Sequence, residues 1–321
     1  MNDAIEKPAN PLDHVREEVR LIMTTEGLTQ VEIAKEAGIA YGTFTPWMGG
    51  TYKGDNSGIA AKVSRWLETR RERERTAMVL PTAPGFVRTP TASAMLDLFA
   101  FAQSAPDFVV AVGGAGIGKT TAIEEYQKRS SNVFVVTAEP CLSSPNNLLS
   151  AVADAVGVVE RSTNRVSRAV VARLKNAAAL IIIDEAQHLE SKALDQLRTV
   201  HDLAKCGIAI AGNESVFGRL QGGEARGAQF AQLHSRVGMR IVQPKARAKD
   251  ICEILAAWGI DGAAPAGQLL KEIGRKPGAL RNLTKTLRLA GMFASSSGEG
   301  LGPNHIRQAW GQLSSSQLET A

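Results

Sequence analysis

Residues 108–121 read Phe-Val-Val-Ala-Val-Gly-Gly-Ala-Gly-Ile-Gly-Lys-Thr-Thr, and this stretch decides the fold of the central part of the chain. An apolar run is followed by the pattern G-x-x-x-x-G-K-T and then by a helical stretch over residues 121–128. A strand, a glycine-rich loop and a helix in this order form the context in which the pattern binds phosphates. Glycines let backbone N–H groups approach an anion, and the positive N-terminus of the helix faces the same anion. We therefore expect a P-loop that binds ATP.

The P-loop pattern also predicts side-chain roles. Lys119 is expected to reach the β- and γ-phosphates, and the hydroxyl of Thr120 is expected to ligate Mg²⁺. The alternative is an accidental glycine-rich turn, which the flanking strand and helix argue against. The residues expected to contact the nucleotide are Gly113, Gly114, Ala115, Gly116, Ile117, Gly118, Lys119, Thr120, Thr121 and Asp184.

Polar side chains follow two further apolar runs. Residues 180–183 lead into Asp184 and Glu185, and residues 208–211 lead into Gly212 and Asn213. Ligands bind at the carboxyl ends of parallel strands, so we expect Asp184 to hold Mg²⁺ and Glu185 to activate the attacking water. Asn213 is expected to position that water beside the γ-phosphate. Taken alone, the acids could cap a helix and Asn213 could be a turn residue.

The alternation of strands and helices predicts an α/β core with a parallel sheet. Four short apolar runs, at residues 108–112, 133–137, 180–183 and 208–211, alternate with helical stretches. After Pro244 only helices are expected, at residues 248–258, 267–274, 278–293 and 304–313, with a Ser/Gly-rich loop at 295–302. We expect an all-α domain over 1–77, a linker over 78–92, the core over 93–243 and a helical lid over 244–321.

The first segment has the spacing of a helix-turn-helix over residues 28–47. Gly38 permits the tight turn, while Ile39, Phe44 and Trp47 are expected to fill the shared core. Pro46 falls inside the second helix, which must bend there or begin later. That helix carries no Arg, Asn or Gln, so non-specific DNA contact or protein docking is favoured over base reading. The candidate DNA contacts in this segment are Thr43, Thr45 and Lys53. Charges of alternating sign over residues 65–75 predict a solvated, salt-bridged helix.

Composition limits the remaining choices. The net charge of +5 is compatible with a polyanionic partner or with an inert basic surface. The three cysteines form no CxxC pair, so we expect no zinc site and no disulfide framework. The charged start lacks a secretory signal, and the longest apolar run, residues 177–183, is too short to cross a bilayer. We expect a soluble cytoplasmic protein without a membrane partner.

The expected lid helix carries two stripes. Leu280, Leu283 and Leu287 have the spacing of a core face. Arg281, Lys285 and Arg288 repeat on an adjacent face. Lys285 and Arg288 are candidate contacts to the phosphates of a duplex, although a solvated face is the more common outcome for such a stripe.

The order of these motifs resembles the AAA+ ATPases. In that family a Walker A loop, a Walker B Asp-Glu pair and a sensor Asn precede a helical lid, which here carries Gly278-Ala-Leu-Arg281. The resemblance implies that Arg281 is a second sensor over the nucleotide. It also implies an arginine lent to the γ-phosphate of a neighbouring subunit, for which Arg236 is the first candidate and Arg226 and Arg240 are rivals. A surface ion pair is the alternative for Arg236.

Nearly the entire chain resembles the family of phage Mu transposition protein B. The resemblance rests on the helix-turn-helix, the Walker motifs, and Lys276-Pro-Gly-Ala-Leu-Arg281 in one short chain. It implies a protein of the bacterial host cytoplasm that forms ATP-bound helical filaments on double-stranded DNA with little sequence preference. Such a protein delivers target DNA to the transposase, and hydrolysis releases the DNA. The alternatives are an AAA+ loader or remodeller for replication, and a helix-turn-helix repressor with ATP as a ligand; a small-molecule kinase is the least favoured.

Overall fold

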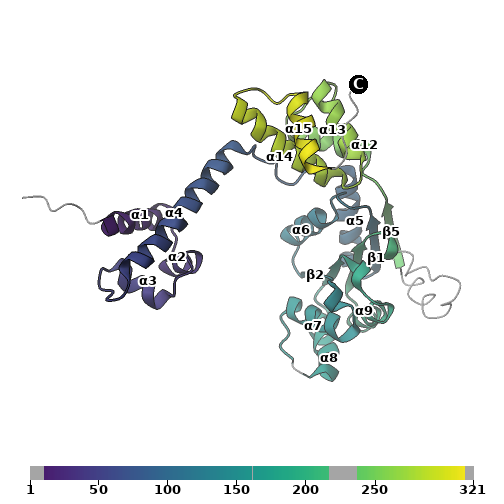
Figure 1. The fold of residues 1–321 in the computed structure, drawn as a ribbon. Helices are drawn as coiled ribbons and strands as arrows, with labels where there is room; N and C mark the ends of the chain where they lie inside the picture. The colour runs from purple at the N-terminus through teal and green to yellow at the C-terminus, as the bar shows by residue number, and fades with distance from the viewer. Residues whose placement is uncertain (1–10, 161, 217–236, 315–321) are drawn as a thin grey trace, which may run out of the picture. The chain divides into compact units, whose positions relative to one another are not determined.

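The structure is a computed structural model that describes residues 11–160, 162–216 and 237–314. Contacts divide the chain into two compact units, Met1–Pro81 and Thr82–Ala321. The first unit holds the helices α1 (Pro11–Glu26), α2 (Gln30–Glu36), α3 (Tyr41–Met48) and α4 (Asn56–Val79) (Figure 1). Thr29 and Glu32 form a capping box that begins α2. Gly38, with φ +66°, makes the turn to α3, and Ile39, Phe44 and Trp47 are buried as predicted.

The helix α3 begins at Tyr41 and continues through Pro46, so a start after the proline is wrong. Proline removes one hydrogen bond inside a helix. The carbonyl oxygen of Pro46 accepts the N–H groups of Thr51 and Tyr52 at 2.9 and 3.2 Å, and these hydrogen bonds hold the loop that follows this short helix.

The helix α4 confirms the salt-bridged character expected from its alternating charges. Arg70 pairs with Glu26 of α1 and with Glu74 of α4, and Arg71 pairs with Glu18 of α1. The helix runs to Val79, beyond the expected end of the first domain, because no proline interrupts it before Pro81. The non-helical stretch before the next helix is therefore shorter than the predicted linker.

The second unit is built on a five-stranded parallel sheet with the order β2-β3-β4-β1-β5. The strands are β1 (Phe108–Gly113), β2 (Val133–Thr137), β3 (Leu180–Asp184), β4 (Gly207–Gly212) and β5 (Val237–Gln243). The first four match the predicted runs. The fifth was not predicted, because this edge strand is only half-buried and mixes Gly, Arg and Gln with its apolar residues.

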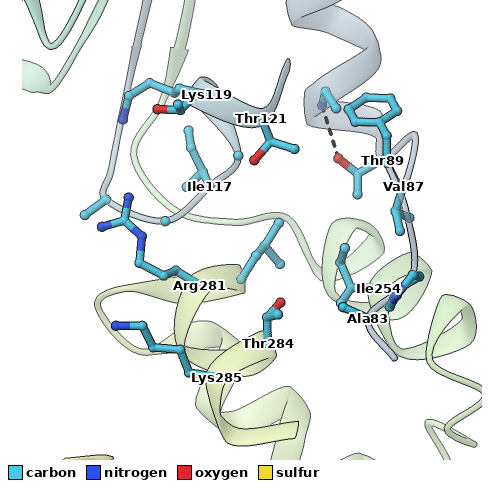
Figure 2. Close-up of a pocket in the computed structure, with 18 of the residues that line it drawn as sticks. Ala83, Val87, Thr89, Ile117, Lys119, Thr121, Ile254, Arg281, Thr284 and Lys285 are labelled. Atoms are coloured by element: carbon cyan, nitrogen blue, oxygen red, sulfur yellow. Dashed lines mark hydrogen bonds between the residues drawn. The ribbon is translucent and has the colours of Figure 1, made fainter. Parts of the chain in front are cut away.

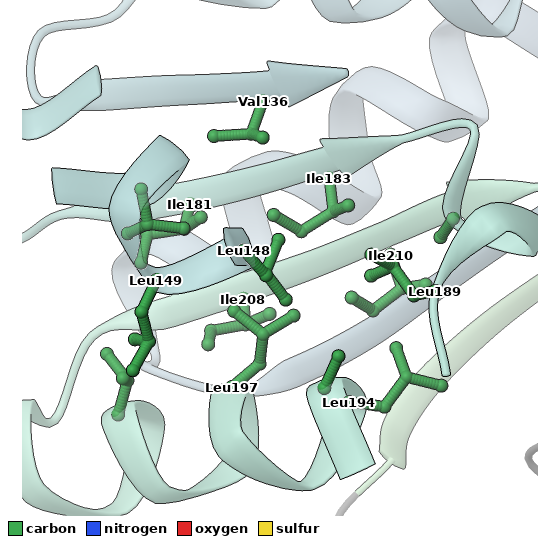
Figure 3. Packing of buried hydrophobic residues seen from close by; sticks show 14 of the residues in the cluster. Val136, Leu148, Leu149, Ile181, Ile183, Leu189, Leu194, Leu197, Ile208 and Ile210 are labelled. Carbon is green, nitrogen blue, oxygen red and sulfur yellow. The ribbon is translucent and has the colours of Figure 1, made fainter. Parts of the chain in front are cut away.

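Helices cover both faces of the sheet, because alternate strand residues point to opposite sides. Val110 and Val112 of β1 pack in one cluster with α7 (Pro145–Val156), α8 (Thr163–Leu174) and α9 (Ser191–Ala204). Figure 3 shows Leu148, Leu194 and Leu197 from these helices against Ile181, Ile183, Ile208 and Ile210 of the strands. Val109 and Ala111 of β1 pack in a second cluster with α5 (Pro90–Ser104) and α6 (Lys119–Arg129).

The chain after β5 forms the expected helical lid. Its helices are α12 (Ala248–Ala257), α13 (Pro265–Arg275), α14 (Ala279–Ser297) and α15 (Pro303–Leu313) (Figure 1). Leu280, Leu283 and Leu287 are buried in the core of the lid, as their spacing predicted. The loop predicted from residue 295 is wrong at its start, because α14 continues to Ser297 and ends at Gly298 in the left-handed conformation.

One buried carboxylate ties the lid to the core. Asp250 of α12 is fully buried and accepts the backbone N–H of Thr91 at 2.9 Å and the Thr91 hydroxyl at 2.6 Å. The same carboxylate accepts the backbone N–H of Arg247 at 2.9 Å. Asp250 thus satisfies unpaired donors in the first turn of α5 and at the start of α12, and it holds the two helix starts together.

Candidate active site

The P-loop connects β1 to α6. Gly118 adopts φ +99°, and Lys119 begins the helix directly after it. The ammonium of Lys119 donates to the carbonyl oxygens of Gly113 and Gly114 at 2.8 and 3.0 Å. The side chain of Lys119 is therefore folded across the loop. Its ammonium lies against the loop that the sequence pattern predicts to bind phosphates.

The strand order brings the other predicted polar residues to the loop. Because β4 lies between β3 and β1, the end of β4 lies between the P-loop and the end of β3. Thr120 donates its hydroxyl to Oδ2 of buried Asp184 at 2.7 Å. A hydroxyl and a carboxylate in contact are ligands that Mg²⁺ prefers, so the pair fits the expected metal role.

The lid closes against the P-loop at a glycine. Gly116 has φ +78°, and a Cβ built on it would lie 2.0 Å from the carbonyl oxygen of Gly278 and 3.2 Å from Cβ of Arg281. No side chain fits between these backbones. The close approach places Arg281, at the start of α14, beside the loop.

A cavity of about 580 Å³ lies between the P-loop and the lid, a volume ordinary for a small-molecule site. Figure 2 shows Lys119, Arg281 and Lys285 toward one side of this cavity, and Val87 and Ile254 toward the other. The predicted site residues that line it are Ala115, Gly116, Ile117, Gly118, Lys119, Thr120, Thr121, Glu185, Asn213, Arg281, Lys285 and Arg288. Lys285 and Arg288 thus share the cavity with Arg281, although the sequence suggested contact with a duplex.

The apolar part of the cavity was not predicted. It is formed by Phe86 and Val87 of the segment before α5, by Ile254 and Trp258 of the lid, and by Leu280. These residues come from three stretches far apart in the sequence. Only the closure of the lid over the core brings them together.

The charge on Lys119 is governed by its surroundings. Burial lowers the pKa of Lys119, Glu185 and Asp184 oppose that effect, and Arg281 adds to it. An anionic ligand beside Lys119 and Arg281 would favour the charged form of the lysine, as Glu185 and Asp184 do. The cavity is therefore suited to a strongly anionic ligand such as a triphosphate.

Gln187 belongs to the candidate site, although no sequence motif predicted it. It lines the cavity and contacts both Glu185 and the backbone of Asn213. No spacing rule marks a glutamine two residues after an Asp-Glu pair. Its neighbour at the end of β4 lies 26 positions away, so the contact becomes visible only in the folded sheet.

The other candidates are placed as follows. Arg226 and Arg236 lie outside the described residues, and Arg240 lies on β5 with an exposed side chain. In the first unit Thr45 donates its hydroxyl to Gln30 at 3.0 Å, Thr43 is half-buried, and Lys53 is exposed.

None of the helices among the described residues has the length and apolar character needed to span a bilayer.

Comparison with known proteins adds the following findings. The family described as Mu B transposition protein, C terminal, matches residues 235–313, and the family described as AAA domain matches residues 102–220. The chain is 34% identical over 304 residues to the ATP-dependent target DNA activator B of Escherichia phage Mu, covering 94% of this chain and 96% of that protein. It is 33% identical over 261 residues to the Mu-like prophage FluMu DNA transposition protein B of Haemophilus influenzae, covering 81% and 90%.

The solved structures extend the comparison to the fold. The crystal structure of Cdc6p from Pyrobaculum aerophilum matches with a TM-score of 0.54 and 14% identity, over 73% of this chain and 70% of that chain. At that identity the likeness concerns the fold alone. Together with the AAA domain match, it confirms the AAA+ core predicted from the motifs.

Proposed function

This chain belongs to the family of Mu B transposition proteins, and from that membership we propose that it is an ATPase whose nucleotide state controls binding to target DNA. ATP-bound subunits assemble as a helical filament on double-stranded DNA, with little sequence preference. The filament delivers target DNA to a transposase, which stimulates hydrolysis and so releases the DNA. The name of the phage Mu relative, ATP-dependent target DNA activator B, supports this proposal.

The cavity between P-loop and lid is the observation that carries the ATPase assignment. Lys119 from the core and Arg281 from the lid lie toward the same side of this cavity, where both would contact the phosphates. The adenine base of ATP would occupy the apolar part of the cavity, beside Val87 and Ile254. Closing the site between two bodies excludes water from the reacting phosphate and makes lid position depend on the nucleotide.

Hydrolysis follows from the polar residues at the strand ends. Thr120 and Asp184 would hold Mg²⁺, which neutralises phosphate charge when bound. Glu185 accepts a proton from the attacking water, and Asn213 orients that water. Lys285 and Arg288 extend the cationic wall of the cavity, and this place favours a role with the nucleotide over direct contact with a duplex.

The surface of α8 is suited to DNA phosphates. Its sequence, TNRVSRAVVARL, contains three arginines and no acidic residue. Val166, Val170 and Leu174 are buried against the core, while Arg165, Arg168 and Arg173 are exposed. Acidic and basic residues nearly balance over residues 1–81, so the excess positive charge of the chain lies in residues 82–321. Exposed arginines on a helix that has no acidic residue of its own are suited to sequence-independent contact with phosphates, and the guanidinium of Arg173 lies over the ring of Phe134.

The nucleotide switch is tested by fluorescence anisotropy with a random-sequence duplex, with ATP and with ADP. We expect Lys119→Ala to abolish ATP-dependent binding, because the phosphates lose their cation on the loop. We expect Glu185→Gln to hold ATP, to hydrolyse it only at a low residual rate, and to prolong residence on DNA. Equal DNA affinity with and without ATP would remove the switch, and a footprint at one defined operator would favour a repressor.

The α8 surface is tested by replacing Arg165, Arg168 and Arg173 with Ala. Removing three phosphate contacts should reduce the slope of log K against log salt by about 2.7. Arg75→Ala is the control, because this exposed arginine of α4 pairs with Glu72 and lies outside the cavity. An unchanged salt slope in the triple variant would assign the DNA contacts elsewhere.

Assembly is tested by electron microscopy of the chain with random duplex DNA. Filaments with ATP and their absence with ADP are the expected result. Replacing Arg236 with Ala should abolish the filaments while leaving ATP binding intact, if this arginine is the one lent to the neighbouring subunit.

A further inference from the structure

A single glutamine joins the two strand ends that carry the proposed hydrolytic residues. We propose that Gln187 positions the carboxylate of Glu185 for hydrolysis and couples that position to the backbone of Asn213; this inference rests on the proposed ATPase function. Gln187 acts through Glu185, and it is a positioning residue.

The contacts use both ends of one amide group. Nε2 of Gln187 donates to Oε2 of Glu185, and Oε1 of Gln187 accepts the backbone N–H of Asn213 at 3.2 Å. An amide offers a donor and an acceptor at once, whereas an ionised carboxylate only accepts. The donor satisfies one oxygen of Glu185 and leaves the other for the attacking water.

The backbone of Glu185 shows why its side chain needs support. It adopts φ 53° and ψ 35°, a left-handed conformation that residues with a Cβ rarely take. Such a conformation persists where surrounding contacts hold it, and such residues concentrate at functional sites. Three hydrogen bonds hold this residue: the Glu185 N–H donates to Oδ1 of Asp184 at 2.9 Å, the His188 N–H donates to the Glu185 carbonyl at 3.1 Å, and Gln187 donates to the Glu185 carboxylate.

The fit on the β4 side is close. A Cβ on Gly212 would lie 2.8 Å from Oε1 of Gln187, so the amide packs directly on the backbone at this position. Oδ1 of Asn213 accepts the N–H and hydroxyl of Ser215 at 3.0 and 2.7 Å. The NH₂ group of Asn213 is therefore the end that can donate to a phosphate or to water.

These contacts form a path from the nucleotide to the catalytic carboxylate. A phosphate that accepts a hydrogen bond from Asn213 shifts the backbone N–H that donates to Gln187. Gln187 then shifts the carboxylate of Glu185, because the amide NH₂ of Gln187 donates to that carboxylate. Loss of Gln187 should accordingly lower the rate of hydrolysis and leave nucleotide binding unchanged.

The test is Gln187→Met, which keeps the length of the side chain and removes both the donor and the acceptor. The kcat for ATP hydrolysis, measured with saturating duplex DNA, should fall about 10- to 100-fold, while the Kd for ATP should change less than about 2-fold. Gln268→Met is the matched control, because Gln268 is an exposed lid residue whose amide donates to the carbonyl of Gly262 at 3.0 Å. Its kcat should equal that of the wild type.

A double-mutant cycle separates positioning from a merely structural role. In a Glu185→Gln background, Gln187→Met should have no further effect on kcat, because no carboxylate remains to be positioned. If Gln187→Met reduced kcat by the same factor in the Glu185→Gln background as in the wild type, the inference would be overturned. A folded Gln187→Met variant with wild-type kcat would also overturn it.

A second variant tests the donor alone. Gln187→Glu keeps an acceptor for the Asn213 N–H and removes the donor to the Glu185 carboxylate. Its kcat should fall as that of Gln187→Met does, with the Kd for ATP again changed less than about 2-fold, and a wild-type kcat would contradict the contact. A wild-type chain without ATPase activity would overturn the proposed function itself, and the inference with it.

Discussion

The buried carboxylate of Asp250 offers a quantitative test of how the lid is attached. We consider Asp250→Ala, which removes the acceptor for the Thr91 N–H, the Thr91 hydroxyl and the Arg247 N–H. The side chain of Asp250 is 0% exposed, so solvent does not reach the position it leaves. The substitution therefore leaves the N–H groups of Thr91 and Arg247 without an acceptor, because water does not take the place of the lost carboxylate.

The size of the effect follows from the number of donors. A buried donor left without a partner costs about 1–3 kcal/mol. Two backbone N–H groups therefore lower the free energy of unfolding by roughly 2–6 kcal/mol. The Thr91 hydroxyl adds little, because it can rotate toward another acceptor. Asp250→Asn should cost less than Asp250→Ala, because it keeps one carbonyl oxygen as an acceptor.

The assay is equilibrium urea unfolding of the full-length chain, followed by circular dichroism. The control is Asp261→Ala, because Asp261 is exposed and accepts one N–H, that of Ala263, at 2.8 Å. Water can replace that bond, so the control should lose about 0.5–1.5 kcal/mol. A loss at Asp250 no larger than at Asp261 would refute the reasoning, since the donors of α5 and α12 would then have other partners.

Three further predictions concern the loop, its lysine and a buried thiol. Gly116→Ala should abolish binding of a fluorescent ATP analogue, because a left-handed φ and the Gly278 carbonyl at 2.0 Å exclude a methyl group; wild-type affinity would contradict the lid contact. Burial lowers the pKa of Lys119 from 10.5, so the free protein begins to lose this proton below pH 10.5. The affinity for ATP should therefore fall as the pH rises towards 10.5, and calorimetry should detect proton uptake on binding. Affinity independent of pH in that range would contradict the role of Lys119. Burial raises the pKa of Cys206 from 9.0 to about 11, so the folded state keeps the proton that the unfolded state loses, and stability falls between these pH values. Cys206→Ala should reduce that loss by about 2–3 kcal/mol in urea unfolding at the two pH values, and an unchanged loss would rule the thiol out.

An element is predictable from the sequence where a local pattern of residues is compatible with one structure only. The strands at residues 108–112, 133–137, 180–183 and 208–211 were found because strands buried on both faces are continuous apolar runs. The edge strand β5 was missed for the converse reason, since a half-exposed strand keeps polar residues. The end of α14 was misplaced because Ser295 to Ser297 can continue a helix, and only Gly298 ends it.

The site was predictable to the extent that its chemistry depends on short motifs. Gly113 to Thr120 predict phosphate binding because the glycines, lysine and hydroxyl must follow one another along the chain. The roles of Lys285 and Arg288 could not be assigned in this way. Helical spacing predicts that these residues share a face with Arg281, and it does not predict which neighbour that face meets.

The amino-acid sequence by itself determined the parallel α/β core, the P-loop and the acids at the end of β3, because each depends on residues adjacent in the chain. The tertiary structure alone decided that the lid carbonyl of Gly278 meets the loop, that Lys285 faces the nucleotide cavity, and that Gln187 joins Glu185 to Asn213. The physical reason is that these contacts join segments distant in sequence. Hydrogen bonds and close packing act over a few ångströms, and only the packing of the whole unit decides which distant groups come within that range.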